Sequence, residues 1–106
     1  MSLLEISVIP VGVDSLGFDS IVKDAVFLVE EKGVDYQITP TKLIIEGELE
    51  QLMQTAGEIH RQTMASGVKR AITNIVIDDR TDGISLDQQV KSVTESLDLN
   101  KAILQY

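Results

Sequence analysis

The sequence contains no cysteine, so neither a disulfide nor a thiolate metal site can form, and the redox compartment stays undetermined. It also has no apolar run near the roughly 20 residues that a bilayer-spanning helix needs. Its start lacks the basic region and long apolar stretch of a signal peptide. We therefore expect a soluble, cytoplasmic protein.

Positive charge is scarce. Nine basic residues stand against 17 acidic ones, which gives a net charge of -8. Nucleic-acid-binding surfaces depend on clustered Lys and Arg, and the best cluster here is only the pair Lys69-Arg70. The charge therefore argues against a nucleic-acid partner. An acidic field would favour a cationic small ligand, although an acidic balance also serves solubility alone.

Recognisable catalytic signatures are missing as well. The chain has no Gly-rich phosphate loop, no Ser/His/Asp set and no cysteine nucleophile, and Gly12 and Gly17 do not form a dinucleotide fingerprint. No cofactor is implied. The sequence therefore predicts a protein that is not an enzyme.

The hydrophobic patterns predict seven helices and strands in one domain, residues 1–106, with two of the strands in a hairpin. A strand, a helix, a hairpin, a second helix, a strand and a C-terminal helix are expected over 3–11, about 18–32, 35–48, 48–67, 70–78 and 85–97. Asp14 or Ser15, or later Asp19-Ser20, could cap the first helix. Residues 99–106 are left open as a further helical turn or a packed tail.

This β-α-β-β-α-β order predicts an α+β, ferredoxin-like fold. Two helices would cover one face of a four-stranded antiparallel sheet, with the C-terminal helix added. The other face would show the side chains of Glu5, Ser7, Ile9, Gln37 and Thr39, with either Lys42-Ile44-Glu46 or Leu43-Ile45, depending on register. Because that face is apolar in places, contact between the sheets of two copies would cover it, and we expect a homo-oligomer.

The stretch 35–47 is the clearest structural signal. Pro40 separates two extended segments, and Leu43-Ile44-Ile45 is an apolar run typical of a strand covered on both faces. Glu46 follows this run directly. A buried carboxylate must be paired or hydrogen-bonded, so Glu46 either faces a ligand or meets Lys42 or a backbone group.

Two further groups of residues have both a functional and a structural interpretation. His60 is the only histidine; it could be a base or a ligand-stacking group, or a helix-edge residue with one ring nitrogen hydrogen-bonded. The cluster Asp78-Asp79-Arg80 with Asp82 could hold a hard cation, but its spacing matches no calcium loop and Arg80 can pair with one of the aspartates, so a solvated turn is the better interpretation.

Threonines and an asparagine form the remaining candidate set. If the hairpin and the last strand share a sheet, four polar residues would cluster and could satisfy the donors and acceptors of a heterocycle: Thr39, Thr41, Thr73 and Asn74. Strand threonines alone carry little information, because β-branching already favours them there.

Taken in order, several segments resemble one small family. They are residues 5–12, 36–40, 45–48, His60, and 70–80 with its Ile-Asp-Asp-Arg ending. No single piece is specific, but the ordered set is similar to the YkoF-like thiamine-binding family, and the resemblance covers roughly 3–97. One departure is Thr41-Lys42-Leu43, where the family often has Met-Gly-Thr; this changes the size and polarity of a pocket.

The resemblance implies ferredoxin-like domains that pair through their sheets as dimers or tetramers, and a small-molecule partner. Some members bind thiamine or its hydroxymethylpyrimidine part without known catalysis. The family positions matched in this chain are Pro10, Thr39, Glu46, Gly47, His60, Thr73 and Asp78. The function implied is a non-catalytic carrier or sensor. The alternatives are a ligand-free structural or regulatory homo-oligomer and, third, an enzyme with His60 and Glu46 as an acid-base pair, which requires the two to converge.

Overall fold

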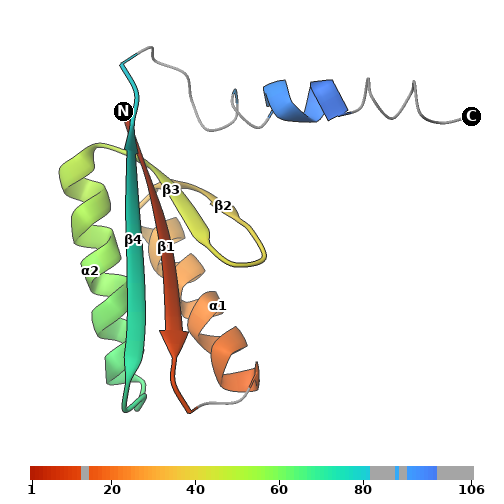
Figure 1. The fold of residues 1–106 in the computed structure, drawn as a ribbon. Helices are drawn as coiled ribbons and strands as arrows, with labels where there is room; N and C mark the ends of the chain where they lie inside the picture. The colour runs from red at the N-terminus through yellow and green to blue at the C-terminus, as the bar shows by residue number, and fades with distance from the viewer. Residues whose placement is uncertain (13–14, 82–87, 89–90, 98–106) are drawn as a thin grey trace, which may run out of the picture.

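The computed structural model describes residues 1–12, 15–81, 88 and 91–97. Its elements follow the predicted order (Figure 1): β1 (Ser2–Pro10), α1 (Ser15–Glu31), β2 (Asp35–Ile38), β3 (Leu43–Gly47), α2 (Leu49–Ala65) and β4 (Ala71–Asp79). Residues 91–97 are helical. The expected N-cap Ser85, two residues of its apolar face, Leu86 and Val90, and the tail 99–106 lie outside the described residues.

The sheet confirms the ferredoxin-like α+β fold. Its strand order is β2-β3-β1-β4, and every neighbouring pair is antiparallel. Both long helices lie on one side of the sheet (Figure 1). Within the described part of the chain, no helix is long and apolar enough to cross a membrane.

Strand register decides which residues face the helices. Leu4 lies opposite Ile45 and Ile6 opposite Leu43, and all four side chains are buried. Since successive side chains of a strand point to opposite faces, Ile44 and Glu46 lie on the side away from the helices. We call that side the open face. It carries Leu3, Glu5, Ser7 and Ile9 of β1, Ile72, Asn74, Val76 and Asp78 of β4, Ile44 and Glu46 of β3, and Asp35 and Gln37 of β2.

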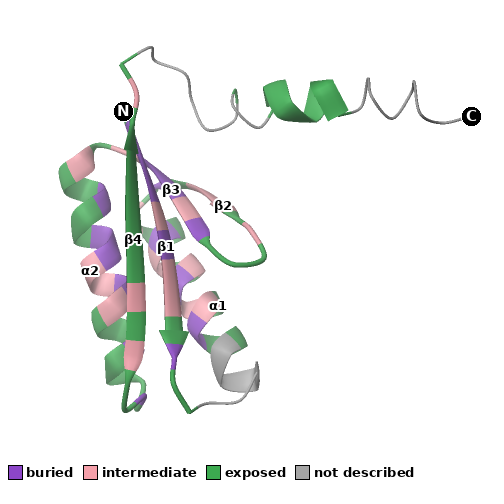
Figure 2. Cartoon of the chain, viewed as in Figure 1, coloured by how far each residue is buried: buried purple, intermediate pink, exposed green. Residues whose placement is uncertain are grey.

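The core lies between the helices and the three strands β2, β3 and β1. Figure 2 shows that burial is concentrated on β1, β3 and the inner sides of the helices. The buried core residues are all aliphatic: Leu4, Ile6, Ala25, Val29, Val34, Leu43, Ile45, Leu52, Ala56 and Ile59. By contrast β4 is an edge strand, and Ile75 and Ile77 stay 41% and 43% exposed although they face the helix side.

Helix α2 matches the sequence prediction closely. It begins after Glu48, and the chain turns at Gly67, whose φ of +100° is a left-handed conformation that favours glycine. Two threonines on its inner side are buried, and each donates its hydroxyl to a carbonyl one turn back: Thr55 to Gln51 (2.8 Å) and Thr63 to Ile59 (2.9 Å). These bonds explain how polar residues occupy the buried stripe.

Helix α1 begins at Ser15, earlier than the predicted start near residue 18. Asp19 therefore lies inside the helix and is not its cap. At the other end, an ion pair of 2.9 Å between Lys32 and Glu58 joins the end of α1 to α2. The two helices thus form one layer over the sheet.

Candidate functional site

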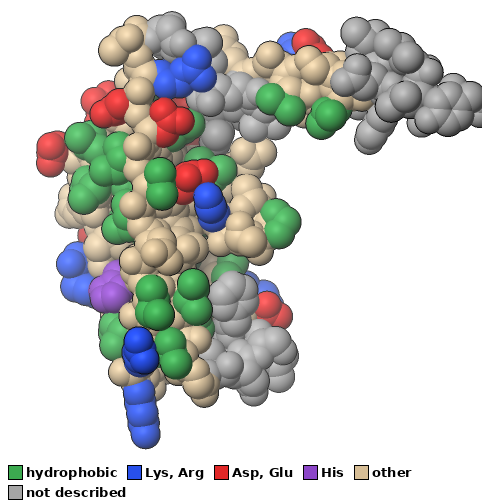
Figure 3. Space-filling model, viewed as in Figure 1, with side chains coloured by type: hydrophobic (Ala, Val, Ile, Leu, Met, Phe, Trp, Pro, Cys, Tyr) green, Lys and Arg blue, Asp and Glu red, His purple; other side chains and the backbone are tan. Residues whose placement is uncertain are grey.

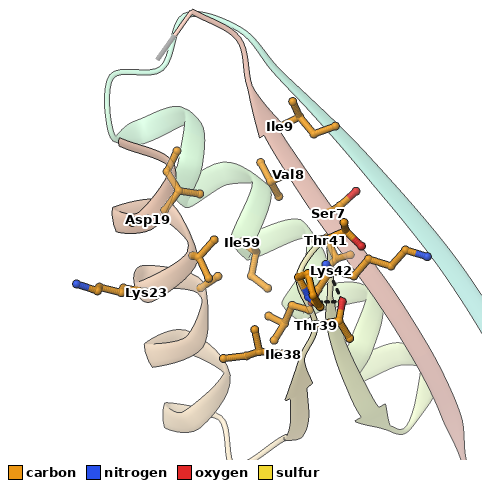
Figure 4. Close-up of a pocket in the computed structure, with 16 residues that line it drawn as sticks. Ser7, Val8, Ile9, Asp19, Lys23, Ile38, Thr39, Thr41, Lys42 and Ile59 are labelled. Carbon is orange, nitrogen blue, oxygen red and sulfur yellow. Dashed lines mark hydrogen bonds between the residues drawn. The ribbon is translucent and has the colours of Figure 1, made fainter. Parts of the chain in front are cut away.

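A cavity of about 680 Å³ lies between α1, β1 and the tip of the β2–β3 hairpin (Figure 4). We call it the tip pocket. Its walls are mainly aliphatic and come from five elements: Ile6 and Val8 of β1, Ile21, Val22 and Ala25 of α1, Ile38 at the end of β2, Leu43 at the start of β3, and Ile59 of α2. Pockets for small organic ligands usually measure roughly 300–1,000 Å³ and are lined in this way.

The hairpin tip is held by a compact set of hydrogen bonds. The Thr39 amide donates to the Lys42 carbonyl (2.9 Å), and the Lys42 amide donates to the Thr39 hydroxyl (3.0 Å). That hydroxyl donates in turn to the Lys42 carbonyl (3.1 Å). Pro40, which has no amide to satisfy, sits between them. The tip therefore presents Thr39, Pro40 and Thr41 to the pocket as a preformed rim (Figure 4).

Three charged residues line the tip pocket: Asp19, Lys23 and Lys42. The Lys42 ammonium lies 3.5 Å from the Glu5 carboxylate on the open face, and Figure 4 shows its chain crossing β1. The ammonium of Lys23 points away from the strands in the same view. Asp19 has neither a hydrogen bond nor an ion pair to any other described residue.

Of the predicted ligand residues, Thr39 and Thr41 line the tip pocket and the others do not. Pro10 is buried at the end of β1, opposite Ala71. Gly47 ends β3, where an added Cβ would make contacts of 3.4 Å with Gln51 and Leu52 of α2. Neither position lines the tip pocket.

His60 and Thr73 meet on the helix side of β4. The Nδ1 atom of the half-buried His60 lies 2.7 Å from the Thr73 hydroxyl, which links α2 to the edge strand. Figure 3 shows the histidine at the molecular edge beside these elements. This is the helix-edge arrangement that the sequence offered as one interpretation. Asn74 points to the open face, so it does not join Thr73, and β1 separates both from the hairpin.

Glu46 is on the open face, only 8% exposed, between Leu3 and Asp35 on the neighbouring strands. Lys42 forms an ion pair with Glu5. Because His60 lies on the opposite side of the sheet, the two residues do not form an acid-base pair.

The acidic end of β4 has a structural contact. Asp79 accepts a hydrogen bond from the Ser2 hydroxyl. Asp78 lies opposite Leu3 on the open face. Among the described residues, which do not include Asp82, no group of acidic or histidine side chains is arranged to hold a metal ion.

A second hollow of about 770 Å³ lies on the open face. Glu5, Gln37, Ile44 and Val76 contribute to it, together with Val93 and Thr94 of the helical segment 91–97. Exposed aliphatic side chains lie on the same face: Ile9, Ile72 and Val76 are 48%, 43% and 50% exposed. Figure 3 shows hydrophobic side chains gathered over β1 and β4.

The sequence did not single out Asp19, Val22 or Ile59 as site residues. Each lies within a helical pattern that predicts packing or solvation equally well. They become neighbours only because the hairpin tip lies against α1, and no local sequence pattern predicts where the hairpin tip packs.

These features define a ferredoxin-like domain with an aliphatic pocket of ligand size between helix, sheet and hairpin tip. The chain belongs to the thiamine-binding protein family, whose model, described as "Thiamine-binding protein", matches residues 4–94. This agrees with the resemblance seen in the sequence.

Relatives support the same assignment. The chain is 33% identical to UPF0045 protein YqgV of Bacillus subtilis over 102 residues, which cover 92% of this chain and 98% of that protein. It is also 33% identical over 99 residues to a UPF0045 protein of Methanothermobacter thermautotrophicus, with coverage of 92% and 100%.

Solved structures share the fold. A Thermotoga maritima protein with the provisional name thiamine biosynthesis/salvage protein matches with a TM-score of 0.74 at 24% identity, covering 87% of this chain and 97% of that one. A Bacillus cereus domain of unknown function matches with a TM-score of 0.70 at 27% identity, covering 84% and 86%.

Proposed function

We propose that this chain is a non-catalytic binding protein, acting as a carrier or sensor, for thiamine or a hydroxymethylpyrimidine-type precursor. The ligand would occupy the tip pocket. The observation that carries the proposal is an aliphatic cavity of about 680 Å³, open between three elements, in a member of a thiamine-binding family.

The chemistry of the pocket suits a small aromatic heterocycle. Aliphatic walls such as Val8, Val22 and Ile59 offer apolar contact to the two faces of a flat ring, and burying them against a ligand is favourable. Thr41 at the rim can add a hydroxyl donor or acceptor. The rigid Thr39–Lys42 turn reduces the entropy lost when a ligand binds.

The name of the Thermotoga maritima protein also refers to thiamine, but a similarity at 24% identity supports only the shared fold. The role of the tip pocket therefore depends on a direct test. Isothermal titration calorimetry with thiamine and, separately, with hydroxymethylpyrimidine should give saturable binding by the wild-type chain.

A pocket-filling variant shows where the ligand binds. Val22→Trp puts an indole into the cavity and should abolish binding of both compounds. Glu31→Trp, on the exposed end of the same helix and outside the lining, is the matched control and should bind as wild type does. Thermal unfolding checks that both variants fold. If the wild type binds neither compound, the proposed function is wrong. If Val22→Trp binds as well as the wild type, the ligand binds elsewhere on the protein.

A second candidate function is a structural or regulatory homo-oligomer without a ligand. The open face supports it, since three large aliphatic side chains there are 43% to 50% exposed, and a second copy packed sheet to sheet would cover them. Light scattering after size-exclusion chromatography tests self-association. Val76→Lys should lower the mass if this face is the contact, while Phe27→Lys, on the outer surface of α1, should not.

A further inference from the structure

The charged residues around the tip pocket are not equivalent. Lys42 is held by Glu5 across β1 at 3.5 Å, so its positive charge is compensated on the open face. Lys23 directs its ammonium away from the strands (Figure 4). Asp19 is the only carboxylate among the charged lining residues, and it has no hydrogen bond or ion pair to another described residue.

The hydroxyl of Thr39 is also committed. It accepts from the Lys42 amide and donates its proton to the Lys42 carbonyl, so it has no proton left for a ligand. Thr41 is the remaining hydroxyl on the hairpin side of the pocket. Ser7 of β1 adds one more hydroxyl to the lining, so the ionised groups Asp19 and Lys23 and the hydroxyls of Ser7 and Thr41 are left for polar recognition of a ligand.

We infer that Asp19 is the specificity-determining residue of the tip pocket, and that it selects heterocycles carrying an amino group beside a protonated ring nitrogen. This inference rests on the proposed function. An ionised carboxylate has two oxygens that only accept hydrogen bonds, so it matches two adjacent N–H donors in one plane. An aminopyrimidine protonated on the ring nitrogen next to its amine presents that pair.

The position of Asp19 fits this role. It lies near the start of α1, while the aliphatic walls formed by Val22 and Ala25 follow within the next two turns of the helix. A ring that packs between these walls and Val8 of β1 can bring one edge to Asp19 and leave its other edge to the hairpin tip. Asp19 is an exposed residue, so water screens its charge. Charge-assisted hydrogen bonds are still about twice as strong as neutral ones, and this contact would therefore contribute more to polar selectivity than the neutral hydroxyls of the lining.

The inference predicts a pH-dependent preference. A carboxylate that binds only the protonated ring favours proton uptake by the ligand on binding. Affinity for an aminopyrimidine should therefore fall as the pH rises above the pKa of the free ring. This trend should be weaker in a chain without the Asp19 charge.

The test compares Asp19→Asn with Asp24→Asn. Both remove one negative charge from α1 with little change in shape, and Asp24 is outside the pocket lining. The probes are thiamine, hydroxymethylpyrimidine, and the hydroxymethylpyrimidine analogue without its amine, each titrated into the intact protein. Asp19→Asn should weaken hydroxymethylpyrimidine at least about tenfold, whereas Asp24→Asn should change it less than about twofold.

The outcomes separate this inference from the proposed function. The loss caused by Asp19→Asn should largely vanish with the analogue that lacks the amine, because one hydrogen bond of the pair is already absent. If the wild type binds hydroxymethylpyrimidine and Asp19→Asn binds it equally well, the inference is wrong while the proposed function stands. If Asp19→Asn weakens the binding of thiamine but not of hydroxymethylpyrimidine, Asp19 faces the thiazolium cation, and this outcome also overturns the inference. If the wild type binds none of the probes, the proposed function fails, and the inference with it.

Discussion

The ammonium of Lys42 lies 3.5 Å from the carboxylate of Glu5, so an ion pair joins the hairpin tip to the middle of β1. Glu5 is on the open face, whereas Lys42 also lines the tip pocket on the helix side. This ion pair therefore connects a residue of the pocket lining to a residue of the open face. Any ligand that moves the hairpin tip must also change this ion pair.

The Lys42–Glu5 pair should contribute little to the free energy of unfolding. Its side chains are 44% and 30% exposed, and exposed ion pairs are worth about 0–1 kcal/mol. We expect a double-mutant cycle of Glu5→Gln and Lys42→Met, measured by urea unfolding, to give a coupling below about 1 kcal/mol that decreases with added salt. A coupling of several kcal/mol would contradict the solvent-exposed geometry.

The contact between His60 and Thr73 should stabilise β4. The Nδ1–Oγ1 distance is 2.7 Å, and β4 is an edge strand with little other cover. We expect Thr73→Val to lower the free energy of unfolding by about 0.5–1.5 kcal/mol in urea titrations, as for other lost hydrogen bonds. The control is Asn74→Ala, the next residue on the opposite face. A cost as large for this control would mean that the loss is not specific to the His60 contact.

Leu43 and Ile44 provide a sharp test of the register of β3. Leu43 is 7% exposed in the core, while Ile44 faces the other side of the sheet. Leu43→Asp should therefore cost several kcal/mol, about 3 or more, because it buries an unpaired charge. Ile44→Asp should keep the chain folded by circular dichroism and act mainly on self-association. Equal destabilisation by the two variants would contradict the register.

Tyr36 should titrate abnormally. Its hydroxyl donates a 2.6 Å hydrogen bond to Glu30, and this bond, followed by desolvation and the negative charge of Glu30, raises the pKa of the phenol above its usual value of 10.0. The neutral phenol is thus favoured by folding. Its stabilising effect is complete below the pKa of the unfolded chain and is lost as the pH rises through the higher pKa of the folded chain.

The measurement is the ultraviolet absorbance of phenolate in a Tyr106→Phe background, where Tyr36 is the only tyrosine. The midpoint should lie above that of a model phenol, and Glu30→Gln should bring it back down. A midpoint that Glu30→Gln leaves unchanged would show that Glu30 is not the cause.

Local chemistry in the sequence was sufficient to predict the order of the elements and the limits of α2. Acidic residues at its start and Gly67 at its end act within one or two turns, so no distant contact is needed to place them. The family segments and the candidate residues Thr39 and Thr41 were visible in the same way. The alternation in 43–46 was visible too, but it left two registers open.

Only tertiary structure chose between those registers, because β3 pairs with β1, whose residues lie some 40 positions away in the sequence. Leu4 lies opposite Ile45. This pairing buries Leu43 and Ile45 and leaves Glu46 on the open face. The same pairing puts β1 between the hairpin and β4, so Thr39 and Thr73 do not share a site. Asp19 became a pocket residue for a related reason. The sequence of a helix does not tell whether an exposed carboxylate borders a cavity, and for Asp19 the packing of α1 beside β1 and the hairpin tip decides this.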